Sequence, residues 1–359
     1  MSSLEPPSDP VPRVRSKLAP SSVTFGAAFV VSMVTLGLLS YLPIPYVLEG
    51  PGPTVDVLGS TDGHELIQVP GEPSHPVTGA LLLTTVVAHG SDLGSLSAWQ
   101  LITGYFNASE ALLPYDVVYP RDSTAEERQA LSEQQMLSSQ ETATAAALQH
   151  LGMDIGVVVE ETRSESAKEV FQVGDRFVTV GGAPIHSFAD LQQTMADVEP
   201  GAVVDVVVLR AGVERTLSAA TTTGDSGEAV FGLGVGLDFP VDVEFGVDDI
   251  GGPSAGAMFA LGIIDKLGPT DLAAGHVIAG TGTVEQTGAI GAIGGIEQKM
   301  IAARRDGAEV FLAPADNCAE VVGHEPAGLL IVKVATLDDA VAALAEIAAG
   351  DADRTPRCG

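Results

Sequence analysis

The chain has 359 residues, 45% of them hydrophobic, so it is long enough for about two domains and too apolar to be disordered. Its 47 Asp and Glu against 17 Lys and Arg give a formal charge of −30, which repels phosphates and excludes nucleic acid as an expected partner. The two cysteines and the scattered histidines form no zinc-binding pattern, and no GxxxxGK[ST] loop occurs. We therefore expect no metal, no cofactor and no ATP.

The first distinctive feature is an apolar, uncharged stretch at residues 23–42, long enough to span a bilayer. Three basic residues precede it and no basic cluster follows, so the charge bias predicts a single-pass signal-anchor helix in the cell membrane. Residues 1–22 would be a cytoplasmic tail and the rest would lie outside the cytoplasm. A cleaved signal peptide and a buried core helix are the alternatives, but the stretch lacks a clear A-x-A site and is long for a signal sequence.

The next segment, residues 43–150, begins with Pro, Gly and short β-type runs such as Ala80–Val87 and ends in a helix-forming stretch, Thr124 to His150. It is predicted to be the extracytoplasmic N-terminal part. In that compartment a disulfide between Cys318 and Cys358 is chemically permitted, and it would tie the C-terminal tail, residues 349–359, back to the domain. Two unpaired thiols are the alternative.

A small β-rich module is predicted over residues 152–222. Its expected elements are strands at 155–159, 176–180 and 203–209 and a helix that starts at Ser187. The order resembles a PDZ domain, and the matching residues are Gly174–Gly182, Ser187–Leu191, Pro200–Gly201 and the β-run that ends in Leu209-Arg210. The resemblance implies capture of an extended peptide at a sheet edge, with the terminal carboxylate bound by the loop that contains Ile155, Gly156 and Val157. A purely structural module is the alternative.

The sequence around Ser254 favours nucleophilic chemistry. Gly251 and Gly252 give a tight turn, Pro253 suits a first helical turn, and a mostly apolar run follows. Ser254 is thus expected at a helix N-terminus, where the dipole and unpaired N–H groups stabilise an alkoxide or an oxyanion. A capping or packing serine is the alternative.

Lys299 lies on the apolar side of a predicted helix, residues 296–305. It shares one face with Ile296, Met300 and Ala303. A buried lysine has a lowered pKa, and its neutral amine can accept a proton from a serine hydroxyl. The alternative is a lysine whose stem covers apolar surface while its charge reaches solvent. Thr281, in a turn after a predicted buried strand, either holds this lysine in place or is a simple turn residue.

These motifs together resemble the proteolytic domain of the Lon protease family. The resemblance is carried by Gly-Pro-Ser254-Ala-Gly, the Thr281-Gly282 turn, Gly288, Ile293 to Ile296, Lys299, Ala302 to Arg304 and a β-run that ends in Pro314. With the predicted anchor and the PDZ-like module, the whole chain resembles the membrane-anchored, PDZ-containing Lon-like proteases of bacteria. The resemblance implies an α/β (α+β) proteolytic domain over residues 225–348 without an ATPase module. Lon proteolytic domains assemble as rings, but one sequence indicates no interface, so whether this chain is a homo-oligomer stays open.

For the site, the resemblance implies Ser254 as nucleophile, Lys299 as general base and later general acid, and Thr281 as a supporting residue. Backbone N–H groups around Gly252, Pro253 and Ser254 would form the oxyanion hole. The sequence departs from the Lon pattern at Gly251, where an aspartate usually precedes Gly-Pro-Ser.

We hypothesise that the PDZ-like module is inserted within the proteolytic domain, whose halves would be Leu48–His150 and Glu228–Ile347. The expected function is a membrane-anchored, ATP-independent serine endopeptidase with a Ser-Lys dyad that cleaves unfolded or membrane-proximal proteins outside the cytoplasm. The alternative is an inactive PDZ scaffold that binds protein C-termini at the membrane surface. A signal-peptidase-like enzyme fits less well, because Lys299 is on a helix and the turns are rich in glycine.

Overall fold

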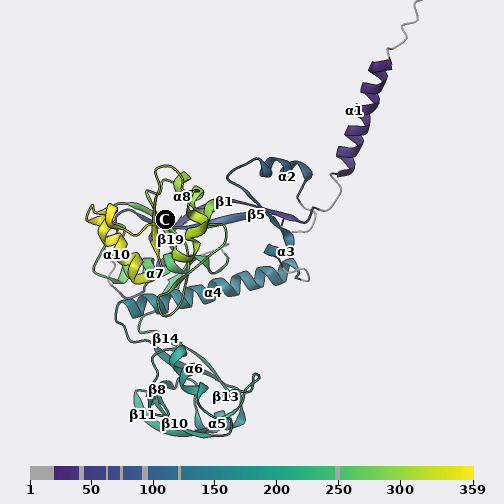
Figure 1. Ribbon diagram of the computed structural model, residues 1–359. Coiled ribbons are helices and arrows are strands. Elements are labelled where there is room, and N and C mark those ends of the chain that lie inside the picture. The colour runs from purple at the N-terminus through teal and green to yellow at the C-terminus, as the bar shows by residue number, and fades with distance from the viewer. Residues whose placement is uncertain are drawn as a thin grey trace, which may run out of the picture.

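The computed structural model describes residues 20–39, 44–61, 64–72, 76–90, 96–119, 123–246 and 251–359, and it has a mixed α/β fold (Figure 1). Two six-stranded sheets dominate these residues. One sheet belongs to a domain that we call the sheet domain, residues 44–150 and 239–359. The other belongs to the inserted module, residues 156–238, which lies beyond α4 (Ala125–His150) in Figure 1.

The sheet domain is built from both sides of the module. Its strands, in chain order, are β1 (Tyr46–Asp56), β5 (Ala80–His89), β6 (Ala111–Pro114), β16 (Val277–Gly280), β19 (Val310–Pro314) and β20 (Leu330–Val334). They lie in the order β20-β19-β16-β5-β1-β6. β5, β16, β19 and β20 are parallel, and β1 is antiparallel to both β5 and β6. Three strands precede the module and three follow it, which is the arrangement that the insertion hypothesis expects.

Helices cover both faces of this sheet. The helices of the sheet domain are α2 (Ala98–Tyr105), α3 (Tyr115–Val118), α4, α7 (Gly256–Leu267), α8 (Ile296–Arg305), α9 (Cys318–Val321) and α10 (Leu337–Ala348). Successive side chains of a strand point to opposite faces, so Leu81 and Leu83 of β5 pack with α4, α7 and α10, while Leu82 packs with α8 and α9. The parallel strands are therefore buried on both sides.

The long helix α4 starts at the predicted residue. Thr124 caps it, and the side chain of Glu127 accepts a hydrogen bond from the Thr124 N–H, so two otherwise unpaired donors are satisfied. Its last third is rich in buried alanine, which lets α7 pack closely against it. Gly256, at the start of α7, illustrates this closeness, because a Cβ there would lie 3.0 Å from Ser139 Oγ of α4.

The inserted module has its own core around Phe171, Phe177 and Phe231. Its elements are β7 (Gly156–Thr162), α5 (Glu165–Val170), β8 (Arg176–Val180), β9 (Ala183–Pro184), α6 (Phe188–Ala196), β10 (Val203–Arg210), β11 (Val213–Ala220), β12 (Thr222–Thr223), β13 (Ala229–Val230) and β14 (Leu233–Asp238). The main sheet has the order β11-β10-β8-β7-β14, with β9 paired to β8. Ser187 caps α6 as predicted.

The predicted module boundary at residue 222 is too early. β14 pairs with β7 and completes the sheet, so the module ends near Asp238 and residues 225–238 do not belong to the sheet domain. The remaining short elements of the described chain are β2 (Ser60–Thr61), β3 (His64–Glu65), β4 (Ile67–Gln68), β15 (Glu244–Phe245), β17 (Thr283–Val284), β18 (Ile290–Gly291) and the 3-10 helices η1 (Pro253–Ala255), η2 (Ala315–Asn317) and η3 (Ala352–Arg354).

The N-terminal helix α1 (Pro20–Leu39) occupies most of the predicted anchor segment. Within the described part of the chain, however, no helix meets the length and apolarity needed to cross a membrane, so the predicted transmembrane helix at 23–42 is not supported. Most of the predicted cytoplasmic tail, residues 1–19, lies outside the described residues.

Cys318 and Cys358 form a disulfide, with their Cα atoms 5.0 Å apart. The C-terminal tail packs against β20, where the Lys333 N–H donates to the Pro356 carbonyl over 2.9 Å. The bond closes a loop of 40 residues. It therefore holds the tail on the edge of the sheet.

We expect Cys318→Ser/Cys358→Ser to lower the free energy of unfolding by about 2–4 kcal/mol, because the oxidised chain has fewer unfolded conformations. Urea unfolding with and without a reductant measures the change. The reductant should destabilise the unmodified protein and leave the double variant unaffected. Equal stability of the oxidised protein and the double variant would contradict the prediction.

Candidate active site

Ser254 lies in the first turn of the helical segment that η1 and α7 form. Gly252, just before η1, has a φ of +88°, a conformation that other residues rarely adopt. The Gly252 N–H donates to the Ser132 carbonyl of α4 over 3.3 Å, and Ser139 Oγ donates to the Pro253 carbonyl over 3.2 Å. Helix α4 therefore fixes the loop that carries Ser254.

The structure brings Lys299 and Ser254 together. Lys299 Nζ lies 2.8 Å from Ser254 Oγ, although 45 residues separate them in sequence. The lysine side chain is 2% exposed, on the predicted stripe with Ile296 and Met300. Burial on helix α8 extends beyond this stripe, since the polar side chain of Gln298 is buried as well.

Thr281 links the side chain of Lys299 to the backbone of Ser254, so it holds the lysine in place, which is one of its two predicted alternatives. Its Oγ1 accepts a hydrogen bond from Lys299 Nζ over 3.0 Å and donates to the Ser254 carbonyl over 3.1 Å. The Gly282 N–H donates to the same carbonyl over 2.9 Å. Because Thr281 follows directly after β16, the central sheet positions both Lys299 and Ser254.

Burial lowers the pKa of Lys299 to about 8, and the negative charge of Glu49 opposes part of this shift. At neutral pH a minority of the protein molecules therefore have an unprotonated Lys299 amine, whereas the amine of an ordinary lysine is almost fully protonated. Burial in turn raises the pKa of Glu49, and the charge of Lys299 opposes that shift.

Sequence reasoning missed Glu49. It lies in β1, 250 residues before Lys299, and the packing of α8 on β1 brings them together. The sequence has no local signal for this contact, but in the structure a Cβ at Gly295 would lie 2.0 Å from Glu49 Oε1. Gly295 also has a φ of +67°, so both the space and the backbone require glycine at the start of α8.

Two of the three predicted oxyanion donors need correction. The Gly252 N–H is already bonded to Ser132, and Pro253 has no N–H to donate. The N–H of Ser254 remains the predicted donor, in the first turn of η1, where a helix has no carbonyl partner for it.

A cavity of about 290 Å³ opens beside Ser254 and Lys299, lined by Pro53 and by β5 residues from Leu83 to Val87. β16 pairs with β5 only as far as Leu83, so beyond that residue β5 has β1 on one side and the cavity on the other. An extended polypeptide next to Ser254 would therefore meet the edge of a strand.

The loop predicted to bind peptide, Ile155 to Val157, is packed inside the protein. Ile155 packs against α4 residues, Gly156 has no room for a Cβ beside Arg176, and Val157 is fully buried in the module core. β7 lies between β8 and β14, so it has no free edge to which a peptide strand could add.

We expect Thr281→Val to lower kcat by about 10- to 100-fold with little change in KM, because a buried amine loses a hydrogen-bond partner while the valine keeps the volume. Thr281→Ser, which keeps the hydroxyl, should retain most of the activity. Steady-state cleavage of a fluorogenic peptide measures both values. A valine variant as active as the serine variant would show that the hydroxyl has no role.

Residues 238–345 match the family model of the Lon protease (S16) C-terminal proteolytic domain. This part of the chain is therefore a proteolytic domain of the Lon-type serine endopeptidases, which are hydrolases. The match contains Ser254, Thr281 and Lys299, and it starts where the inserted module ends.

Individual relatives include Lon proteases and another serine endoprotease. The chain is 33% identical over 134 residues to the Lon protease of Azospirillum brasilense, covering 35% of this chain and 16% of that protein. It is 36% identical over 87 residues to the periplasmic pH-dependent serine endoprotease DegQ of Escherichia coli, covering 23% of this chain and 19% of that protein. The chain thus spans less than a fifth of the length of either relative. A solved PDZ domain of the SdrC-like protein from Listeria monocytogenes matches 22% of this chain and 86% of its own, with 17% identity and a TM-score of 0.21.

Proposed function

We propose that this protein is an ATP-independent serine endopeptidase in which Ser254 and Lys299 form a catalytic dyad. The 2.8 Å contact between Lys299 Nζ and Ser254 Oγ in a buried setting carries the proposal. The lowered pKa of Lys299 supports its role as a base, because only the neutral amine can accept a proton. The absence of a GxxxxGK[ST] sequence supports activity without ATP.

In the proposed reaction, neutral Lys299 takes the hydroxyl proton of Ser254 as Oγ attacks the scissile carbonyl carbon. The Ser254 N–H stabilises the negative oxygen of the tetrahedral intermediate. The protonated lysine then gives its proton to the leaving amine, and an acyl-enzyme remains. Lys299 next takes a proton from a water molecule as its oxygen attacks the acyl carbon. The bond from that carbon to Ser254 Oγ then breaks, protonated Lys299 returns the proton to Oγ, and the carboxylic acid product leaves.

The substrate in this proposal is unfolded or extended polypeptide. The strand edge of β5 at residues 84–87 supports this, since an extended chain can add there through backbone hydrogen bonds. A folded protein offers no such strand to a cavity of about 290 Å³. The disulfide between Cys318 and Cys358 supports a location outside the cytoplasm, where such bonds persist.

We also propose that the inserted module binds peptide, as PDZ domains do. Its binding site would be the groove between α6 and β14. This site replaces the predicted loop at Ile155. If the chain had no peptidase activity, this groove would still support the second candidate function, a peptide-binding scaffold. The groove has a volume of about 910 Å³ and is larger than the cavity beside Ser254. This size is the observation that favours the peptide-binding scaffold.

A serine-directed fluorophosphonate probe tests the peptidase proposal. We expect it to label the protein at one site, with labelling lost in Ser254→Ala and kept in Ser218→Ala, whose hydroxyl lies in the module. Unfolded casein should be cleaved without nucleotide. A protein that is neither labelled nor able to cleave casein would leave the scaffold as the function.

A further inference from the structure

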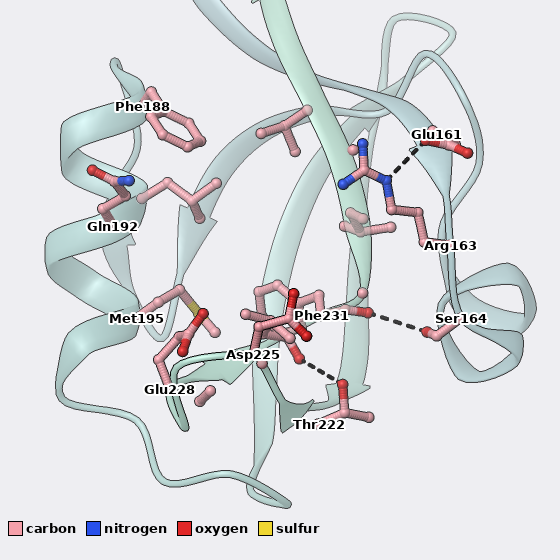
Figure 2. A pocket seen from close by; sticks show the side chains of 18 of the residues that line it. Glu161, Arg163, Ser164, Phe188, Gln192, Met195, Thr222, Asp225, Glu228 and Phe231 are labelled. Atoms are coloured by element: carbon pink, nitrogen blue, oxygen red, sulfur yellow. Dashed lines mark hydrogen bonds and ion pairs between the residues drawn. The ribbon is translucent and has the colours of Figure 1, made fainter. Parts of the chain in front are cut away.

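The inserted module contains a groove of about 910 Å³ between α6 and β14 (Figure 2). Phe188, Leu191 and Met195 of α6 form one apolar wall, and Phe231 and Val235 lie opposite. In Figure 2 the side chains of Phe188 and Met195 project from α6 toward β14. A concave apolar surface of this size is typical of a binding site.

The second wall of the groove is a strand edge. Among the described residues, β14 pairs with β7 alone, so its other edge faces the groove. Gly234 and Gly236 alternate along β14 with Leu233, Val235 and Leu237. An extended polypeptide can add to this edge through backbone hydrogen bonds while alternate side chains enter the groove.

The charged side chains around the groove are mostly acidic. Four carboxylates line it, on Glu160, Glu161, Asp225 and Glu228, against one guanidinium, on Arg163. Arg163 Nε donates to Glu161 Oε2 over 2.8 Å, so its charge is largely neutralised within the protein. The lining therefore carries a net charge of −3, from four negative charges and one positive charge.

Two of these carboxylates lie at one end of the groove. Asp225 and Glu228 belong to the turn of the β12–β13 hairpin, and β13 leads within three residues into β14. Figure 2 draws both at the same end of the groove, and Phe231 follows the hairpin two residues before β14 begins. A terminal carboxylate at this end would face two negative charges, whereas a lysine or arginine side chain would be attracted to both.

We propose that this groove binds an extended internal segment of polypeptide with basic side chains, rather than a free C-terminus. The inference rests on the proposed peptide-binding role of the module and adds the chemical class of its ligand. In this arrangement the module selects cationic, unfolded chains for the protease domain to which it is joined.

Fluorescence anisotropy on the full-length Ser254→Ala protein tests the proposal without cleavage. The probes are three fluorescein-labelled, C-terminally amidated dodecapeptides with Leu and Val at the same positions and Lys, Gln or Glu at the others. We expect the Lys peptide to bind about 10-fold more tightly than the Gln peptide and the Glu peptide to bind least, with affinity falling as salt increases. A Lys peptide with a free C-terminal carboxylate should bind no better than its amide.

Two double variants test which carboxylates cause the preference for the Lys peptide over the Gln peptide. Asp225→Asn/Glu228→Gln should reduce the preference for Lys over Gln about fivefold, because two attractive charges are lost. The matched control, Glu169→Gln/Glu214→Gln, removes two exposed carboxylates of the module that do not line the groove and should leave the preference unchanged.

Three outcomes would overturn the inference: equal binding of the Lys and Glu peptides, tighter binding of the free-acid form, or equal effects of the two double variants. The peptide series is measured on an unaltered groove, so it stays informative if a groove variant unfolds. Because binding is measured with Ser254→Ala, its result is independent of whether the unmodified protein cleaves casein.

Discussion

Ser254→Ala and Lys299→Met should each reduce kcat/KM for an unfolded protein by at least about 10³-fold, since a nucleophile and its base act as a unit. The introduced methionine would keep most of the lysine volume in the apolar packing with Ile296 and Met300, so the fold should survive. Cleavage of fluorescein-labelled casein measures the loss, and circular dichroism checks the melting temperature. We expect the two substitutions combined to cost little more than either alone.

Lys168→Met is the matched control for the lysine substitution. Lys168 lies on the module surface, where it pairs with Glu165, and it should be dispensable for cleavage. Residual activity above one tenth of the unmodified level in either dyad variant would contradict the proposed mechanism. A variant that has lost its cooperative melting transition would be replaced by Lys299→Gln, which retains polarity at the same site.

Activity should rise with pH and level off above about 8, the pKa to which burial lowers Lys299. Protonated Lys299 cannot accept the serine proton, so only molecules with a neutral Lys299 are active. Below the pKa of Lys299, this active fraction increases tenfold for each unit by which the pH rises. At pH 6 kcat/KM should therefore be about 100-fold below its plateau. Single-turnover cleavage of a fluorogenic peptide between pH 5.5 and 9.5 measures the profile.

Glu49→Gln should move this rise to lower pH. The carboxylate of Glu49 raises the pKa of Lys299, so its removal makes the amine easier to deprotonate. Glu65→Gln is the matched control, because the carboxylate of Glu65 binds Lys266 instead. A profile that is flat from pH 6 to 9, or a shift of Glu49→Gln toward higher pH, would exclude Lys299 as the titrating base.

The helical positions of Ser254 and Lys299 could be predicted because their signals are local. Glycine, proline and an apolar stripe marked the helices that carry Ser254 and Lys299, and Lys299 stood out as a charged residue on an apolar face. Their contact depends on sheet pairing between distant strands, for which one sequence offers no direct signal. Glu49 could not be predicted as a neighbour of Lys299, since their proximity arises only when β1 packs on α8.

The module was harder to predict at its end than in its middle. Its central strands β7, β8 and β10 are rich in valine, whereas β14 reads Leu-Gly-Val-Gly-Leu-Asp, and glycine has low strand propensity. The strand is stable because it pairs with β7 along its length. β14 was not predicted, and the peptide-binding loop was placed at Ile155, Gly156 and Val157.

The interleaved sheet has a consequence for the order of events during synthesis. β1 and β5 leave the ribosome first, but β5 obtains its parallel neighbour β16 only after about 190 further residues, including the whole module, have been made. Glu49 precedes this interval and Lys299 follows it, so the two residues are 250 positions apart in the sequence. The module can therefore fold while the surrounding domain is still open, and a nascent chain has no assembled dyad. The proposed dyad can therefore assemble only after α8 has been synthesised, long after β1 and β5.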